Sequence, residues 1–183
     1  MILFVNACVR SKSRTHRLAA QLISTLEGPV TEVCLEKIPF PVANEIFLRE
    51  RDKLLLLQDY DNPMFALARE FAAADTIVIA APFWDLSFPA SLKQFFEQIN
   101  VIGITFMYDE QGVPQGLCKA KKLYYVTTAG GPVFCEDYGF GYVRALAQNF
   151  YGIQDVRLIK AEGLDIVGAD VEEILRNSAK TFM

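Results

Sequence analysis

Short apolar runs alternate with amphipathic segments along most of this chain. Met1–Ala7 and Thr76–Ala81 are almost continuously apolar, which is typical of strands that are buried on both faces. Ser91–Asn100 repeats apolar residues at the spacing of one helix face. The same two patterns predict strands at Val30–Leu35, Lys122–Thr128 and Val156–Ala161, and helices at Thr15–Leu26, Pro63–Ala74, Tyr142–Phe150 and Val171–Phe182.

Strands and helices follow one another in strict alternation. This order predicts an α/β fold in which helices cover both faces of a parallel sheet. Two stretches fit less well. Glu36–Asn62 is long for one connection and contains a four-leucine run that suggests a short helix, and Thr105–Lys119 contains the Gly and Pro residues of an excursion. The length of 183 residues predicts a single domain spanning positions 1–183.

Composition narrows the classes of partner. Apolar residues make up 52% of the chain, and the net charge of −4 provides no basic concentration that would favour a nucleic-acid partner. No apolar run approaches the roughly 20 residues that a membrane helix needs. The first residues also lack the pattern of a secretory signal. We therefore expect a cytoplasmic protein with no membrane partner.

The four cysteines are widely spaced, and His16 is the only histidine that could join them in a metal site. This set lacks the spacing of a structural zinc site, so no metal is predicted. In a reducing compartment the four thiols are expected to be free. His16 lies at a basic helix start, where a solvated side chain is a simpler interpretation than a catalytic base.

Open parallel sheets bind ligands at the carboxyl ends of their strands, near the point where the strand order reverses. The loop after the first predicted strand runs directly into a helix and contains three cations and three hydroxyls: Arg10, Ser11, Lys12, Ser13, Arg14 and Thr15. Unpaired N–H groups at the helix start would form a phosphate site together with these side chains. Simple capping of the helix by Ser13 or Thr15 explains the loop equally well, and the two roles are compatible.

Two further loops are expected on the same rim. Ala81–Leu86 (APFWDL) follows a buried strand and offers aromatic cover for a flat ring, although ordinary core aromatics explain it more simply. Thr127–Pro132 contains paired glycines, which let a ligand approach the backbone closely, although a plain turn also explains them. Together the three loops indicate a mononucleotide with a flat head group.

Several other motifs are absent. The chain contains neither the GxxxxGK[ST] phosphate loop nor the GxGxxG dinucleotide loop. Asn6 and Pro82 stand where a response-regulator receiver needs acidic residues. A GxSxG nucleophile elbow is also missing. These absences argue against phosphoacceptor and serine-nucleophile chemistry.

With these motifs the chain resembles the flavodoxin-like FMN-dependent NAD(P)H:quinone oxidoreductases and azoreductases. The resemblance lies in IAAPFWDLSFPASLKQFFEQI, GITFMYDEQGVPQGL and KKLYYVTTAGG, in NACVRSKSRTHRLA near the start, and in Ala161–Gly163. It covers most of the chain and is weakest over residues 36–62. It implies a flavodoxin-like three-layer sandwich with a five-stranded parallel sheet in the order 2-1-3-4-5.

The resemblance also implies roles for individual residues. The residues expected to hold the FMN phosphate are Arg10, Ser13, Arg14 and Thr15. Those expected to line the flavin ring are Pro82, Phe83, Trp84, Asp85 and Leu86, with Thr128, Ala129, Gly130 and Gly131 at the pyrimidine end. Trp84 and Phe106 are the expected substrate contacts. Phe106 matches an aromatic that reaches the flavin site of the other subunit, since the family usually forms homodimers.

Three positions depart from the family pattern. Cys8 stands where serine is frequent, which removes one hydroxyl from the phosphate loop. Asp85 replaces a common asparagine, and its charge would disfavour an anionic reduced flavin. Ala129 replaces an arginine of some azoreductases, so the preference for nicotinamide or substrate is open.

The activity implied by the resemblance is a ping-pong transfer of two electrons, by hydride transfer, from NADH or NADPH through FMN to a quinone or azo compound. Backbone N–H groups of residues 84–86 would steady the ring as charge develops. No protein acid or base is predicted, and Tyr108 and Tyr138 are more simply surface or packing residues. The alternatives are a flavodoxin-type electron carrier without its own substrate, an NAD(P)H-dependent FMN reductase, and a flavin-free interaction domain.

Overall fold

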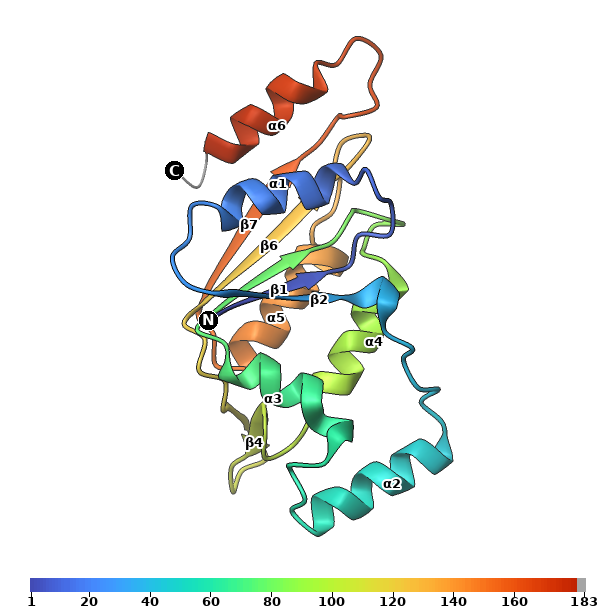
Figure 1. The fold of residues 1–183 in the computed structure, drawn as a ribbon, viewed down its shortest axis with the longest axis vertical. Coiled ribbons are helices and arrows are strands. Elements are labelled where there is room, and N and C mark those ends of the chain that lie inside the picture. The colour runs from blue at the N-terminus through green and yellow to red at the C-terminus, as the bar shows by residue number, and fades with distance from the viewer. Residues whose placement is uncertain (181–183) are drawn as a thin grey trace.

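A five-stranded parallel sheet forms the centre of the computed structural model, which describes residues 1–180 (Figure 1). Its strands are β1 (Ile2–Asn6), β2 (Val30–Cys34), β3 (Thr76–Ala80), β6 (Lys122–Thr128) and β7 (Asp155–Ala161). They lie in the order β2-β1-β3-β6-β7, and every neighbouring pair is parallel. The predicted order 2-1-3-4-5 is confirmed, since β6 and β7 are the fourth and fifth strands of this sheet.

Helices cover both faces of the sheet, as the alternation of elements predicted (Figure 1). Helices α1 (Arg14–Ile23) and α6 (Val171–Ala179) pack on one face, and α3 (Ala66–Ala73), α4 (Ala90–Ile99) and α5 (Tyr142–Asn149) pack on the other. Successive residues of β3 alternate between the two apolar cores, so that Ile77 and Ile79 face one core while Val78 and Ala80 face the other. Burial on both faces explains why this strand is apolar throughout.

Helix boundaries differ from the predicted ones where local capping decides them. Ser13 caps α1, because its side chain accepts a hydrogen bond from the His16 N–H, so the helix begins at Arg14. The segment predicted as one helix at Pro63–Ala74 starts with a 3-10 turn at Pro63–Phe65 and continues as α3. The helix predicted at Val171–Phe182 is α6, and Phe182 lies outside the described residues.

The long connection after β2 contains a 3-10 turn at Leu35–Lys37 and a helix, α2 (Glu45–Leu56), which is longer than the predicted leucine segment. Leu54 is the only residue of α2 that is buried. Figure 1 shows α2 projecting from the body at the end of the molecule that also carries β4. Leu54 belongs to the core and Leu55 packs against it, whereas Ile46, Leu48 and Leu56 are exposed.

The predicted excursion before β6 is a two-stranded antiparallel hairpin of β4 (Phe106–Tyr108) and β5 (Pro114–Gly116). Gly116 packs directly on the backbone of Tyr151 and Gly152, where a Cβ atom would overlap that backbone. The hairpin leads into the amino end of β6. It therefore lies at the opposite end of the sheet from the carboxyl ends of the strands.

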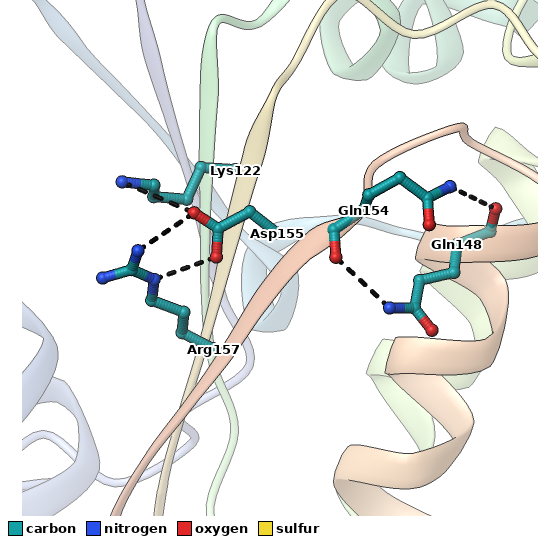
Figure 2. A network of polar contacts seen from close by, with 5 residues as sticks. All are labelled: Lys122, Gln148, Gln154, Asp155 and Arg157. Atoms are coloured by element: carbon teal, nitrogen blue, oxygen red, sulfur yellow. Dashed lines mark hydrogen bonds and ion pairs between the residues drawn. The ribbon is translucent and has the colours of Figure 1, made fainter.

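A polar network fixes the amino ends of β6 and β7 (Figure 2). Asp155 accepts hydrogen bonds from Arg157 Nε at 2.9 Å and Nη2 at 3.1 Å, and its Oδ2 lies 3.6 Å from Lys122 Nζ. The side-chain amides of Gln148 and Gln154 each donate to the backbone carbonyl of the other. These contacts attach the edge strand β7 to β6 on one side and to α5 on the other.

Among residues 1–180, every helix is too short or too polar to cross a lipid bilayer.

A second ionic contact fixes the amino ends of β1 and β3, and it generates a pH-dependent prediction. Asp75 Oδ1 lies 2.6 Å from Lys119 Nζ, and the amino group of Met1 contacts the same carboxylate. These two cations, Lys119 first, lower the pKa of Asp75 to about 2. The stabilisation is therefore complete above the unfolded pKa of about 3.9 and is lost as the pH falls through the folded pKa.

We expect Asp75→Asn to unfold at a lower urea concentration than the parent protein at pH 7. The difference between the two proteins should shrink as the pH is lowered from about 4 to about 2, because Asp75 is already protonated in the unfolded state and becomes increasingly protonated in the folded state. Equilibrium urea titrations at several pH values measure it. A difference that stays constant over this range would contradict an ionic origin.

Candidate functional site

The candidate site is a cleft at the carboxyl ends of the central strands. It collects the three loops that the sequence singled out, together with the loop after β7. The cleft is lined by Val9, Arg10, Lys12, Ser13, Arg14, Thr15, Pro82, Phe83, Trp84, Thr128, Gly130 and Asp165. One end of this set is cationic and rich in hydroxyls, and the other end is aromatic.

The polar end is built around the first turn of α1. The first backbone hydrogen bond of the helix is donated by the Arg17 N–H to the Ser13 carbonyl at 3.2 Å, and the His16 N–H is capped by Ser13 Oγ. This leaves the N–H groups of Arg14 and Thr15 without a partner inside the helix. Unpaired N–H groups at the positive end of the helix dipole favour an anion. The capping role of Ser13 is observed, and it leaves room for an anion.

Thr15 connects the α1 loop to the loop after β6. Its buried hydroxyl lies 2.6 Å from the hydroxyl of Thr128, and either oxygen can be the donor. The hydrogen bond between the two hydroxyls holds the two cleft loops at a fixed separation. The hydroxyl that donates in this pair keeps lone pairs that can accept a further hydrogen bond. Both residues line the cleft.

Arg14 is anchored to the loop after β7. Its Nη1 donates to the Leu164 carbonyl at 3.0 Å and to Asp165 Oδ1 at 2.8 Å. The hydrogen bond from Arg14, with the charges of Arg14 and Arg10, lowers the pKa of the Asp165 carboxyl. Arg10 and Lys12 are exposed at the same end of the cleft. Three cations and one carboxylate thus surround the start of α1.

The paired glycines have two different environments. A Cβ atom at Gly130 would lie 2.9 Å from Cγ of Asp165 and still closer to its Oδ2, whereas a Cβ atom at Gly131 would meet nothing within 4 Å. Gly130 therefore makes room for a side chain of the protein, and Gly131 leaves open space. The sequence interpretation, in which both glycines serve the approach of a ligand, does not account for Gly130.

The aromatic end consists of Pro82, Phe83 and Trp84. The Phe83 N–H donates to the Thr128 carbonyl at 3.0 Å, which joins this loop to the loop after β6. The Trp84 side chain is 40% exposed, although it lies on the cleft. An aromatic surface left this open at the end of a buried strand is suited to covering a flat apolar ring.

A tight turn follows Trp84. Trp84 and Ser87 exchange two backbone hydrogen bonds, and the residues between them, Asp85 and Leu86, have φ angles of 50° and 67°. Two consecutive positive φ values are the pattern of a type I′ turn, which normally selects Asn and Gly. Ser87 Oγ donates to the Tyr138 carbonyl at 2.7 Å and ties the turn to residues 137–141, which form a π-helical turn.

Some residues predicted for the site lie outside the cleft lining. Asp85, Leu86, Ala129 and Gly131 belong to the loops at its edge but do not line it. Phe106 is buried at the other end of the sheet, with its ring 4.9 Å from that of Phe150. The structure of one chain therefore does not bring Phe106 to the cleft, and Tyr108 shares its location in the hairpin.

Three lining residues were absent from the predicted set: Val9, Lys12 and Asp165. Val9 and Lys12 lie within the predicted phosphate loop itself. Asp165 follows the last strand of the sheet, and the carboxyl end of that strand is on the same rim as the others. Examination of the loop after the fifth strand would have found it.

Asp165 is the only carboxylate among the described residues that line the cleft. Burial raises the pKa of the Cys8 thiol to about 11, and the Sγ atom contacts the Ala80 carbonyl at 3.8 Å. All four cysteines are free, as predicted, and residues 1–180 contain no cluster of three metal-ligating side chains. His16 is half-buried and packs on the Phe4 ring at 5.7 Å.

Comparison with known proteins shows the family to which this chain belongs. A family model described as the flavodoxin-like fold matches residues 1–183. The chain belongs to this family. An FMN-dependent NADH:quinone oxidoreductase of Coprothermobacter proteolyticus is 37% identical over 194 residues, which cover 98% of this chain and 94% of that protein.

Two further relatives of this flavodoxin-like protein differ in coverage. FMN-dependent NADH:quinone oxidoreductase 2 of Clostridium acetobutylicum is 47% identical over 123 residues, which span 64% of this chain and 60% of that protein. Among solved structures, an FMN-dependent NADH-azoreductase from Bacillus anthracis in complex with FMN superposes with a TM-score of 0.80 and 21% identity. That superposition covers 99% of this chain and 94% of the other, and it supports the fold.

The turn at Asp85 and Leu86 generates a stability prediction. A non-glycine residue in the left-handed region costs about 1–2 kcal/mol, and glycine avoids this cost but loses about 0.5–1 kcal/mol through its larger unfolded-state entropy. We therefore expect Leu86→Gly to raise the free energy of unfolding by about 0.5 kcal/mol, measured by urea titration.

Leu57→Gly is the matched control, because Leu57 is also exposed but has a φ of −79°. It should lower the free energy of unfolding, since glycine brings only its entropic cost there. If Leu86→Gly destabilised the protein as much as Leu57→Gly does, the turn would carry no backbone strain.

Proposed function

We propose that this flavodoxin-like protein, as one domain over residues 1–183, binds FMN and is an NADH-dependent oxidoreductase that reduces quinones or azo compounds. The observation that carries the proposal is the polarity of the cleft. A helix start with hydroxyls and cations lies at one end, and the aromatic residues Phe83 and Trp84 lie at the other. This arrangement fits a phosphate monoester joined to a flat ring, and the relatives named as FMN-dependent NADH:quinone oxidoreductases support it.

The chain's own residues divide the binding task. The N–H groups of Arg14 and Thr15, with the guanidinium of Arg14 and the cations of Arg10 and Lys12, would hold the phosphate. Pro82, Phe83 and Trp84 would cover the ring from one side, and the backbone after β6 would approach it at Gly131, where the space is open. Thr128 is already paired with Thr15 and would keep these two loops in place.

When bound, FMN would supply the two-electron redox chemistry between the nicotinamide and the acceptor. The protein contributes position and electrostatics. Backbone N–H groups of the turn after Trp84 are held by the Trp84–Ser87 hydrogen bonds and are therefore fixed donors near the aromatic end. The exposed face of Trp84 leaves the cleft open to a flat nicotinamide or quinone.

The active assembly is proposed to be a homodimer. Apolar side chains are exposed on the hairpin region and on α2, at the end of the molecule opposite the cleft loops (Figure 1). They are Ile102, Met107, Tyr108, Val113 and Leu117 on the hairpin side, and Ile46, Leu48 and Leu56 on α2. Monomers rarely expose so many apolar side chains in one region, so a second copy is the expected cover.

Flavin titration and anaerobic reduction test the proposed function. We expect FMN to bind with quenching of its fluorescence, its visible bands to bleach with NADH, and the bands to return on addition of a quinone. Bands that stay oxidised with NADH would favour an electron carrier. Absence of FMN binding would contradict the proposal at its first step.

Trp84→Ala should weaken FMN binding by about tenfold, which corresponds to about 1.4 kcal/mol of lost ring contact. Phe134→Ala is the control, since Phe134 is an exposed aromatic that does not line the cleft. Equal losses in the two variants would show that the aromatic end of the cleft is not the ring site.

Light scattering on the purified protein tests the dimer. The expected mass is twice the 20.5 kDa of one chain, and Met107→Asp on the exposed side of the hairpin should shift it toward one chain. A parent protein with the mass of one chain would contradict the proposed dimer, but it would not contradict the proposal that the protein binds FMN.

A further inference from the structure

One residue, Asp165, joins three of the loops that form the cleft. Asp165 Oδ1 accepts a hydrogen bond from Arg14 at the start of α1, and its backbone N–H donates to the Gly130 carbonyl at 2.8 Å. The same loop is held to the loop after β6 by the N–H groups of Gly163 and Leu164, which donate to Gly131 and Ala129. Asp165 therefore has a fixed backbone from which it reaches across to Arg14.

The Arg14 guanidinium is anchored through one nitrogen. Both of its hydrogen bonds, to Leu164 and to Asp165, come from Nη1. A guanidinium carries five N–H donors, two of them on Nη1, so the edge formed by Nε and Nη2 keeps three. Within residues 1–180 neither Nε nor Nη2 has a hydrogen-bond partner. This is the edge that binds phosphate in a bidentate manner.

Gly130 is the position that lets the carboxylate lie there. The space that a Cβ atom would take at Gly130 is filled by the Asp165 carboxylate, at 2.9 Å from Cγ. A larger residue at this position would force the Asp165 side chain to shift. The glycine and the carboxylate thus act as one unit, although 35 positions separate them in the sequence.

We propose that Asp165 is a positioning residue for the phosphate site: it holds Arg14 by Nη1 so that the Nε–Nη2 edge is presented to the phosphate of FMN. This inference rests on the proposed function, because it needs a ligand with a phosphate group. A free arginine side chain loses up to about 2 kcal/mol of conformational entropy when it is fixed, and Asp165 fixes it before the ligand arrives.

The charge of Asp165 does not cancel the attraction for a phosphate. Arg10, Lys12 and Arg14 supply three positive charges at this end of the cleft against the single carboxylate. The Asp165 side chain is 67% exposed, so water screens its repulsion of an anion. Its main effect is geometric, and its loss should weaken phosphate binding only moderately.

The test separates the phosphate contribution from the rest of flavin binding by comparing FMN with riboflavin, which lacks the phosphate. Fluorescence titrations give the ratio of the riboflavin Kd to the FMN Kd for each variant. Asp165→Ala should lower this ratio about three- to tenfold, whereas riboflavin affinity should stay close to that of the parent protein. Asp165→Asn keeps an acceptor for Nη1 and should retain the ratio within about twofold.

The double variant Arg14→Ala with Asp165→Ala shows whether the two residues act together. If Asp165 works through Arg14, the double variant should have the same ratio as Arg14→Ala alone. Glu172→Ala is the matched control. It removes a similarly exposed carboxylate that pairs with Arg17 on the same helix but lies outside the cleft lining. Its ratio should equal that of the parent protein.

Any of four results would overturn the inference. A higher ratio in both Asp165 variants would mean that the carboxylate opposes the phosphate. Equal losses of FMN and riboflavin affinity in Asp165→Ala would indicate a general structural role. A parent protein that binds the two flavins equally well would lack a phosphate site, whereas one that binds neither would contradict the proposed function as well.

Discussion

Thr128 pairs with Ala161 at the last rung of the β6–β7 ladder, so the two loops that follow leave the sheet side by side. The Ala129 N–H continues this pairing by donating to the Ala161 carbonyl, and the Gly130 and Gly131 carbonyls accept from the loop beyond β7. The same rim holds Phe83 through its hydrogen bond to the Thr128 carbonyl. Parallel register therefore decides which loops meet, and the hydrogen bonds between the cleft loops depend on it. A slip of one residue would turn Thr128 away from Thr15.

The sheet and its covering helices could be predicted because their residues obey simple periodicities. β3 is apolar since both of its faces are buried, and α4 shows one clean apolar stripe since one face is buried. The helix α2 could not be delimited in this way, because only Leu54 and Leu55 of its apolar residues pack on the core, whereas Ile46, Leu48 and Leu56 are exposed. The hairpin of β4 and β5 was visible only as an excursion, since its strands have three residues each.

The site was predictable to the extent that its residues sit in consecutive loop sequences. Ser13, Arg14 and Thr15 lie together in the chain and also in the cleft. Asp165 meets Arg14 across 151 positions, and no local pattern announces that contact. The role of Gly130 could not be predicted from local sequence either. The sequence shows that a small residue is present, but the reason for it, a carboxylate from a distant loop, depends on tertiary structure.

Different interactions fix the two ends of the cleft, and backbone strain is found at only one of them. At the polar end, hydrogen bonds and charge fix the groups: Ser13 caps the helix, Thr15 pairs with Thr128, and Arg14 is held by Nη1. At the aromatic end, Asp85 and Leu86 occupy the left-handed region without being glycine. Such a turn persists only where neighbouring contacts over-determine it, and here the Trp84–Ser87 hydrogen bonds and the bond from Ser87 to Tyr138 do so. Because the backbone after Trp84 is fixed in this way, its N–H groups need little reorganisation to meet charge that develops on a bound ring. The backbone strain at Asp85 and Leu86 accompanies this fixed orientation of the N–H groups.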